Sequence, residues 1–158
     1  MTHWRRRGFV ALLLAQATAG SHAVSSDDAD DQALLADADF AAGMSSLKAG
    51  DAAAALPRLQ SALKRFPDAA DLHNELGFAH RRMRQLDKAF EHYKRALAIN
   101  PTHRGAHEYI GEAYLMIGDV QAAERHLAAL KSICLLSCDE ARDLQKAIAA
   151  HRGSATPR

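Results

Sequence analysis

The chain lacks the features that mark several large classes of protein. Aromatic residues make up only 6% of it, and Trp occurs once. Together with abundant Ala, this scarcity indicates closely packed helices with few large anchors. The sequence has no glycine-rich phosphate loop and no Gly-x-Ser-x-Gly nucleophile motif. We therefore expect a protein that is not an enzyme and needs no cofactor.

An excess of positive charge and a membrane-length apolar run are also lacking. The 20 basic and 19 acidic residues leave a net charge of +1. Nucleic-acid binding usually requires a strongly basic surface, so we expect no nucleic-acid partner. The apolar stretch Phe9–Ala19 has 11 residues, whereas a helix needs about 20 to cross a bilayer.

The N-terminal segment has the layout of a secretory signal peptide. Arg5–Arg7 precedes the apolar stretch, and Ser21 and Ala23 supply small residues around a cleavage site. The alternative is an uncleaved N-terminal anchor. We expect cleavage of residues 1–23 near Ala23, which leaves a periplasmic or secreted bacterial protein with no stable membrane span. Residues 24–31 then form an acidic, disordered leader.

A repeat with a period of 34 residues runs through the rest of the chain. The residues that keep this spacing are Gly43, Gly77 and Gly111, then Ala55, Ala89 and Ala123, and finally Pro67 and Pro101. A fixed period in this range indicates a repeat architecture.

The repeated residues follow one helical motif. The second copy reads His73-x2-Leu76-Gly77-x2-His80, then Ala89-x3-Tyr93 and Pro101. The third reads His107-x2-Ile110-Gly111-x2-Tyr114, then Ala123-x3-Leu127. The first is more degraded: Asp39-x2-Ala42-Gly43-x2-Ser46, then Ala55-x3-Leu59 and Pro67. Over residues 36–137 the chain resembles the tetratricopeptide repeat (TPR) family. The resemblance implies an all-α, TPR-type α-solenoid over 32–152, with helix-turn-helix repeats at about 36–69, 70–103 and 104–137.

Local chemistry supports the helix pairs. The small residues at the repeated Gly and Ala positions would let the two helices of each repeat approach closely. Asp51 and Asp119, each directly after a Gly, are expected to cap the helices that follow. Pro57 falls inside a second helix and removes a backbone hydrogen bond, so we expect that helix to start late or to kink.

A capping helix is expected after the third repeat. Ser137 and Glu140 form a capping-box pattern ahead of an amphipathic stretch, and repeat arrays need a terminal helix with a polar outer face. We therefore predict a helix over 138–152 that Gly153 stops. Residues 153–158 are expected to be a disordered tail.

Cys134 and Cys138 flank the start of that helix. In an oxidising compartment two nearby cysteines usually pair, and a loop at 133–137 would allow a disulfide. Alternatively, Cys138 at a first helical turn would be a reactive thiolate, the two thiolates could hold a soft metal such as Cu(I), or both thiols could be free. We expect the disulfide and no metal.

The C-terminal part also resembles a group of small exported bacterial TPR proteins. They share His-Arg-Gly-Ala-His-Glu-Tyr-x-Gly-Glu-Ala-Tyr, here His103–Tyr114, and then a Cys-x3-Cys followed by acids and a Leu-x3-Ile helix. Here those later residues are Cys134, Cys138, Asp139, Glu140, Leu144 and Ile148. The resemblance implies an exported scaffold.

Several histidines are candidate metal ligands. His103 and His107 are four residues apart, a spacing that can bind metal. His73 and His107, however, stand where the family pattern has Trp, so we expect them to pack between helices. His80 and His92 are expected on different faces by the same helical periodicity. No metal site is therefore expected.

The TPR resemblance implies a concave groove built from the first helix of each repeat. The residues projected onto it are Phe40, Met44 and Leu47, then Asn74, Phe78, Arg81 and Arg82, and finally Glu108, Glu112, Leu115 and Met116. Apolar and Met side chains on such a surface suit partner binding. The alternative is that some of these residues pack under the N-terminal helix or the capping helix. Arg81 and Arg82 would attract an acidic segment. We expect Glu108 and Glu112, which share a helix face, to form groove surface and not an acid–base pair.

This groove departs from the TPR clamp that binds the C-terminal carboxylates of cytosolic chaperones. That clamp needs Lys and Asn on the first groove helix and Lys and Arg on the third. The corresponding surfaces here carry Phe40, Met44, Gly105 and Tyr109. A cytosolic chaperone adaptor is therefore not expected.

The predicted function is that of an exported, non-enzymatic scaffold that binds a protein or peptide, in particular an envelope protein, through its groove. One alternative is a thiol-redox or metal-handling protein that uses Cys134 and Cys138. Another is a self-associating module in which a second copy fills the groove.

Overall fold

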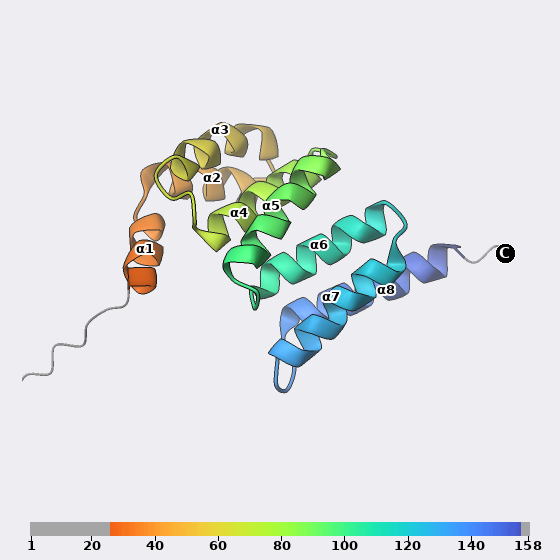
Figure 1. Cartoon of the computed structure of the whole chain (residues 1–158). Coiled ribbons are helices and arrows are strands. Elements are labelled where there is room, and N and C mark those ends of the chain that lie inside the picture. The colour runs from red at the N-terminus through yellow and green to blue at the C-terminus, as the bar shows by residue number, and fades with distance from the viewer. Residues whose placement is uncertain (1–25, 156–158) are drawn as a thin grey trace, which may run out of the picture.

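The computed structural model describes residues 26–155, whose regular structure is helical throughout (Figure 1). The helices are α1 (Ser26–Leu35), α2 (Ala38–Lys48), α3 (Ala52–Leu63), α4 (Ala70–Arg82), α5 (Leu86–Ile99), α6 (Arg104–Met116), α7 (Val120–Ile133) and α8 (Asp139–Ala155). The predicted signal peptide and residues 156–158 lie outside the described residues.

The segment predicted to be a disordered leader is instead helical from Ser26 onward. Helix α1 is anchored by Leu34, whose side chain is 1% exposed and belongs to a core cluster with Phe40 and Leu76. Burial of Leu34 therefore explains why α1 forms, although the acidic composition of its first residues had predicted disorder.

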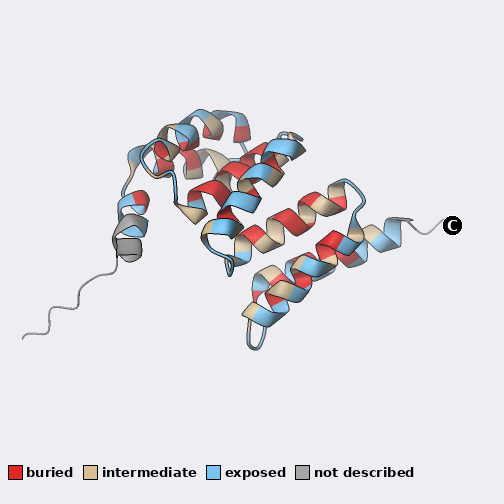
Figure 2. Ribbon diagram, viewed as in Figure 1, coloured by how far each residue is buried: buried red, intermediate tan, exposed pale blue. Residues whose placement is uncertain are grey.

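Three helix pairs form an α-solenoid. Within the pairs, α2 packs on α3, α4 on α5 and α6 on α7, and each pair falls inside one predicted repeat. Between repeats, α2 contacts α4 and α4 contacts α6. The first helices of the repeats thus share one face, which we call the first-helix face. Figure 2 shows buried residues in every repeat and no single central core, as expected when each repeat packs only on its neighbours.

The turns inside the repeats need left-handed backbone at one position. Gly50 and Gly118 have φ of 82° and 80°, and Arg84, midway between them at the same 34-residue step, has φ of 61°. Asp51 accepts a hydrogen bond from the Ala54 N–H and Asp119 from the Ala122 N–H. Both predicted caps are therefore confirmed, and the second repeat makes the same turn without Gly.

Gly43 and Gly77 leave room for a large side chain from the second helix of their repeats. A Cβ on Gly43 would lie 2.5 Å from Cδ2 of Leu59, and one on Gly77 would lie 2.6 Å from Cδ1 of Tyr93. The third repeat differs, because the atoms nearest to Gly111 belong to Leu144 of α8, at 2.7 Å. The predicted close approach within a repeat thus holds for two repeats, while in the third the glycine admits the capping helix.

Helix α3 does not start late despite its proline. It begins directly after Asp51 and continues through Pro57 to Leu63. Pro57 cannot donate to the carbonyl of Ala53, but both residues are exposed. Water can therefore satisfy that carbonyl, which makes the proline tolerable on this side of the helix.

Helix α8 packs against the third repeat at the end of the array. It contacts both α6 and α7. Leu144 is fully buried and Ile148 is 4% exposed, and they share a core cluster with Leu115 and Leu127. The predicted capping role follows from this burial.

The ends of α8 differ from those predicted. The carbonyl of Cys138, and not Ser137, accepts the first helical hydrogen bond, from the Arg142 N–H. At its C-terminal end the helix runs through Gly153 to Ala155, so residues 153–155 are helical and not disordered. Gly153 does not adopt the left-handed conformation with which a glycine ends a helix.

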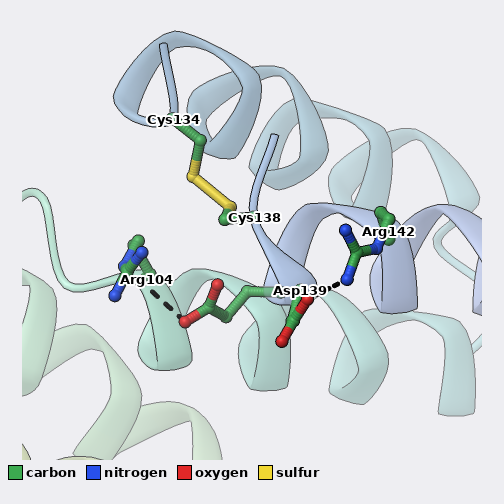
Figure 3. Close-up of a disulfide and its surroundings, with 6 residues drawn as sticks. Arg104, Cys134, Cys138, Asp139 and Arg142 are labelled. Atoms are coloured by element: carbon green, nitrogen blue, oxygen red, sulfur yellow. Dashed lines mark hydrogen bonds and ion pairs between the residues drawn. A yellow bond between two sulfur atoms is a disulfide. The ribbon is translucent and has the colours of Figure 1, made fainter. Parts of the chain in front are cut away.

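A disulfide joins Cys134, which ends α7, to Cys138, which precedes α8 (Figure 3). Cys138 is 8% exposed and both cysteines pack with the core cluster of α8. Figure 3 shows Arg104 of α6 near the bridge. Its Nε lies 3.6 Å from Oε1 of Glu140 on α8. The bridge and this ion pair hold the start of α8 against the third repeat.

Replacing both cysteines with Ser is expected to lower the free energy of unfolding by about 2 kcal/mol, because the bridge closes only a short loop. The measurement is urea unfolding of the oxidised protein and the double variant. In parallel, native protein is incubated with glutathione and its mass is read. A bridge that stays complete supports a structural staple, whereas ready exchange would favour the redox alternative.

Candidate peptide-binding face

An aromatic and charged cluster lies at the centre of the first-helix face. The rings of Phe78 on α4 and Tyr109 on α6 are 5.1 Å apart. The guanidinium of Arg81 lies 5.4 Å from the Phe78 ring centroid and 5.3 Å from that of Tyr109. Its Nη1 is 2.6 Å from Oε2 of Glu112, and its Nε donates to the Tyr93 hydroxyl at 3.3 Å. We call Phe78, Arg81, Tyr109 and Glu112 the central cluster; it ties α4 to α6.

The central cluster changes the expected role of Arg81. Its side chain is only 13% exposed and its charge is compensated by Glu112. It therefore acts mainly as a link between repeats and attracts an acidic partner weakly. Arg82 remains exposed, with its guanidinium 5.9 Å from the Phe78 ring centroid, and it is the cation that a partner can reach.

Three residues expected to face the groove are buried instead. Phe40 is 6% exposed, Asn74 4% and Leu115 8%. Phe40 packs in the first core cluster and Leu115 in the cluster that α8 completes. Asn74 donates to Oε1 of Glu75 at 3.1 Å, and its own Oδ1 is buried without a partner. None of the three can meet a partner in this structure.

The apolar end of the predicted groove is only partly available. Met44 and Leu47 of α2 are partly buried and pack against the first core cluster. Among the apolar groove residues, Phe78 is therefore the best candidate for partner contact, because its ring lies beside the guanidinium groups of Arg81 and Arg82.

Glu108 lies in an acidic setting that sequence spacing did not indicate. Burial, followed by the carboxylates of Glu112, Asp143 and Glu140, raises the pKa of Glu108 to about 7, against the opposing effect of Arg81. Asp143 and Glu140 belong to α8, so the docking of that helix adds to the acidic environment that Glu112 begins. Glu108 is therefore partly protonated at neutral pH and can donate or accept a hydrogen bond.

Tyr109 is the member of the central cluster that the groove projection left out. Its place on the third groove helix was expected only from the comparison with the chaperone clamp. Its counterpart one repeat earlier is Glu75, which gave no sign of an aromatic contact. The only sign in the sequence was that Tyr109 is an aromatic residue directly after Glu108, which was expected on the groove.

Two cavities lie away from the central cluster. One of about 600 Å³ is bordered by the loops before α4 and α6, including Phe66, Asp68 and Ile99. The other, of about 460 Å³, is bordered by Phe90, Tyr114 and other residues of α5 and α6. Neither is lined by a predicted groove residue, so they do not define the candidate face.

The histidines at the Trp positions pack between helices, as predicted. Nδ1 of His73 lies 3.0 Å from Nδ1 of His92, and the same atoms of His107 and His126 are 2.9 Å apart. The prediction that His80 and His92 lie on different faces was wrong. Their rings stack 5.5 Å apart, because α4 and α5 face each other across a short turn.

His103 and His107 do not form a joint site. Nδ1 of His103 accepts the Ala106 N–H at the start of α6, and its Nε2 lies 2.8 Å from Oδ1 of Asp71. Within residues 26–155, no group of three or more His, Cys, Asp or Glu side chains is placed to hold a metal ion.

None of the helices α1 to α8 has the length and apolar character of a membrane span.

The fold defines a helical-repeat protein of the α-solenoid class. Two family models, each described as a tetratricopeptide repeat, match residues 40–104 and 80–133. Together they span more than half of the chain. The chain belongs to the tetratricopeptide repeat family. No curated protein sequence matches it.

Solved structures with the same fold are only distantly similar in sequence. One is the second TPR domain of the human RPAP3 protein in complex with an HSP70 peptide, with a TM-score of 0.63 and 14% identity. That match covers 75% of this chain and 97% of that domain. Another is a mutant O-GlcNAc transferase from Thermobaculum terrenum, with a TM-score of 0.63, 21% identity and 80% of this chain covered. This chain matches 23% of the transferase's length.

Proposed function

We propose that this chain is an exported, non-enzymatic scaffold that binds a segment of an envelope protein along the first-helix face of repeats two and three. The observation that carries the proposal is the central cluster. It holds an aromatic pair and a charged pair in place across two repeats, and such preorganised aromatic and Arg groups are typical of binding surfaces. The peptide complex of the similar human domain supports a peptide ligand.

The partner segment meets different chemistry at different points of the face. Arg82 and Phe78 favour an acidic side chain next to an apolar one. Export is supported by the signal-peptide layout of residues 1–23. The absence of a nucleophile motif supports a binding role in place of catalysis.

Changing Phe78 to Ala together with Arg82 to Glu is expected to weaken binding by about 2 kcal/mol, roughly thirty-fold in Kd. Arg81 is left unchanged because its substitution would break the contacts with Glu112 and Tyr93. To find the partner, a photo-crosslinking residue is placed at Arg82 in protein expressed in the periplasm. The crosslinked protein is then purified and its Kd is measured by calorimetry.

The matched control is Lys88→Glu, which makes the same charge change at an exposed position of α5. Its Kd should stay within twofold of the wild-type value, and circular dichroism should be equal for all variants. Equal crosslinking from positions 82 and 88, or an unchanged Kd for the double variant, would contradict the proposed face. Crosslinks only to a second copy would favour the self-association alternative.

A further inference from the structure

Repeats two and three each contain the same partly buried arrangement of two histidines and a carbonyl. In repeat two, Nε2 of His73 lies 3.1 Å from the Pro67 carbonyl and Nδ1 lies 3.0 Å from Nδ1 of His92. In repeat three the same two distances are 3.0 Å, from His107 to Pro101, and 2.9 Å, from His107 to His126. Each pair joins the first helix of a repeat to its second helix.

The carbonyl decides where the protons lie. A carbonyl only accepts, so Nε2 of His73 carries the proton and donates to Pro67. Nδ1 of the neutral ring is then a bare acceptor, and Nδ1 of His92 donates to it. If Nδ1 of His73 takes up a proton, the contact is kept only when Nδ1 of His92 gives up its own; once both rings are protonated, two N–H groups lie against each other. The same reasoning applies to His107 and His126, so each arrangement is satisfied when both rings are neutral.

Repeat one has an ion pair at the equivalent positions. The residues one period before His73 and His92 are Asp39 and Arg58. Their side chains are 3.2 Å apart. Hydrogen bonds from Ser61, Arg65 and Arg58 hold the pKa of Asp39 below its usual value. The carboxylate of this link therefore stays charged in mild acid.

We propose that the two histidine pairs form an acid-sensitive switch, which loosens repeats two and three as the pH falls below neutrality while repeat one stays closed, and so releases the segment bound on the first-helix face. The release rests on the proposed function. The loosening of the repeats does not, because it follows from the pairs alone.

Some charged groups around the first pair lower the pKa of its histidines and others raise it. Burial is the main cause that lowers the pKa of His73; Arg95 on α5 adds to it, while Asp68 before α4 and Glu91 on α5 oppose it. Burial lowers the pKa of His92 to about 4, helped by His73 and by His80 on α4.

In the second pair, the pKa of His126 is lowered. Burial lowers the pKa of His126 to about 4, and His107 on α6 and Arg125 on α7 add to this. Tyr114 stacks on His126 at 5.7 Å, in the place that His80 has in repeat two. No carboxylate is among the causes that shift the pKa of His126.

The sign of the effect follows from the lowered pKa values. The unfolded chain binds protons on these rings below about pH 6.5, whereas the folded chain binds them on His92 and His126 only near pH 4. Acid therefore favours opening, and stability is lost between these values as the pH falls. Each ring alone would change the opening equilibrium roughly thirty-fold between pH 7.5 and 5; because the rings are partly exposed to solvent, we expect about tenfold.

The test is hydrogen–deuterium exchange of the mature protein at pH 7.5 and pH 5, without any partner and corrected for the intrinsic exchange rate. Protection in α4–α7 should fall about tenfold, while that in α2 and α3 should change less than twofold. Equal loss in all three repeats, or none, would overturn the switch. Because no partner is present, this result does not depend on the proposed function.

A matched variant copies the ion pair of repeat one into the other repeats: His73→Asp with His92→Arg, and His107→Asp with His126→Arg. If it folds, its protection in α4–α7 should be equal at both pH values. If it does not fold, the imidazole resonances of the wild-type protein decide the matter. Resonances of His92 and His126 that titrate at the ordinary value near pH 6.5 would refute the switch.

Discussion

Tyr93→Ala is expected to lower the free energy of unfolding by about 3–5 kcal/mol, the usual range for removing a large buried aromatic side chain. The Tyr93 side chain is fully buried and occupies the space left open by Gly77. Its hydroxyl also accepts the hydrogen bond from Arg81. The variant therefore leaves a cavity between α4 and α5 and removes one contact of the central cluster. Denaturant unfolding followed by circular dichroism measures the change.

Tyr93→Phe separates the two contributions. It keeps the ring in the Gly77 space and removes only the hydroxyl, so we expect a loss of about 1 kcal/mol. If both variants unfold at the same denaturant concentration as the wild type, then Tyr93 does not hold the second repeat together. A large loss for Phe as well as Ala would assign the effect to the hydrogen bond and not to packing.

Leu144→Ala is expected to lower the free energy of unfolding by about 2–5 kcal/mol. Leu144 is fully buried, packs against Gly111 and lies in the cluster that covers Leu115 and Leu127. Shortening it detaches the capping helix from the last repeat and exposes that apolar cluster. We expect a lower midpoint in urea and faster hydrogen exchange in α6–α8 than in α2 and α3.

The neighbouring exposed residue provides the control. Gln145→Ala keeps the helix propensity of α8 and should change the free energy of unfolding by less than about 0.5 kcal/mol. Equal stability of the Leu144 and Gln145 variants would mean that α8 does not cap the array. A loss spread evenly over all repeats would show that the solenoid unfolds as one unit.

Much of the scaffold could be predicted from local sequence. The 34-residue step of Gly43, Gly77 and Gly111 predicted three helix pairs, and the structure contains them. Asp51 and Asp119 cap the predicted helices because a capping carboxylate bonds to N–H groups only a few residues away. His73 and His107 were correctly expected to pack between helices, since their position in the repeat is an interior one.

The candidate face could be predicted only in part. Family geometry correctly placed Phe78, Arg81 and Glu112 on first helices. It did not show that Arg81 is neutralised by Glu112, because that contact depends on the distance between two repeats. Phe40 and Leu115 were expected to be exposed, yet α1 and α8, which no repeat pattern describes, cover the ends of the array.

Two predictions about glycines also differ from the structure. Gly111 was expected to admit the second helix of its own repeat, but the nearest side chain is Leu144, 33 positions further along the chain. Gly153 was expected to end α8, but a glycine ends a helix only where the backbone turns left-handed, and here it does not.

The sequence by itself determined the repeat length, the helix pairs and the turns, because these depend on residues that are near one another or related by one period; it favoured a bridge between Cys134 and Cys138, which the structure contains. Only the tertiary structure decided which groove residues stay accessible, how Arg81 is neutralised and why the pKa of Glu108 is raised. Those properties arise where helices from different repeats and the capping helix meet, and both burial and electrostatic interaction depend on that packing.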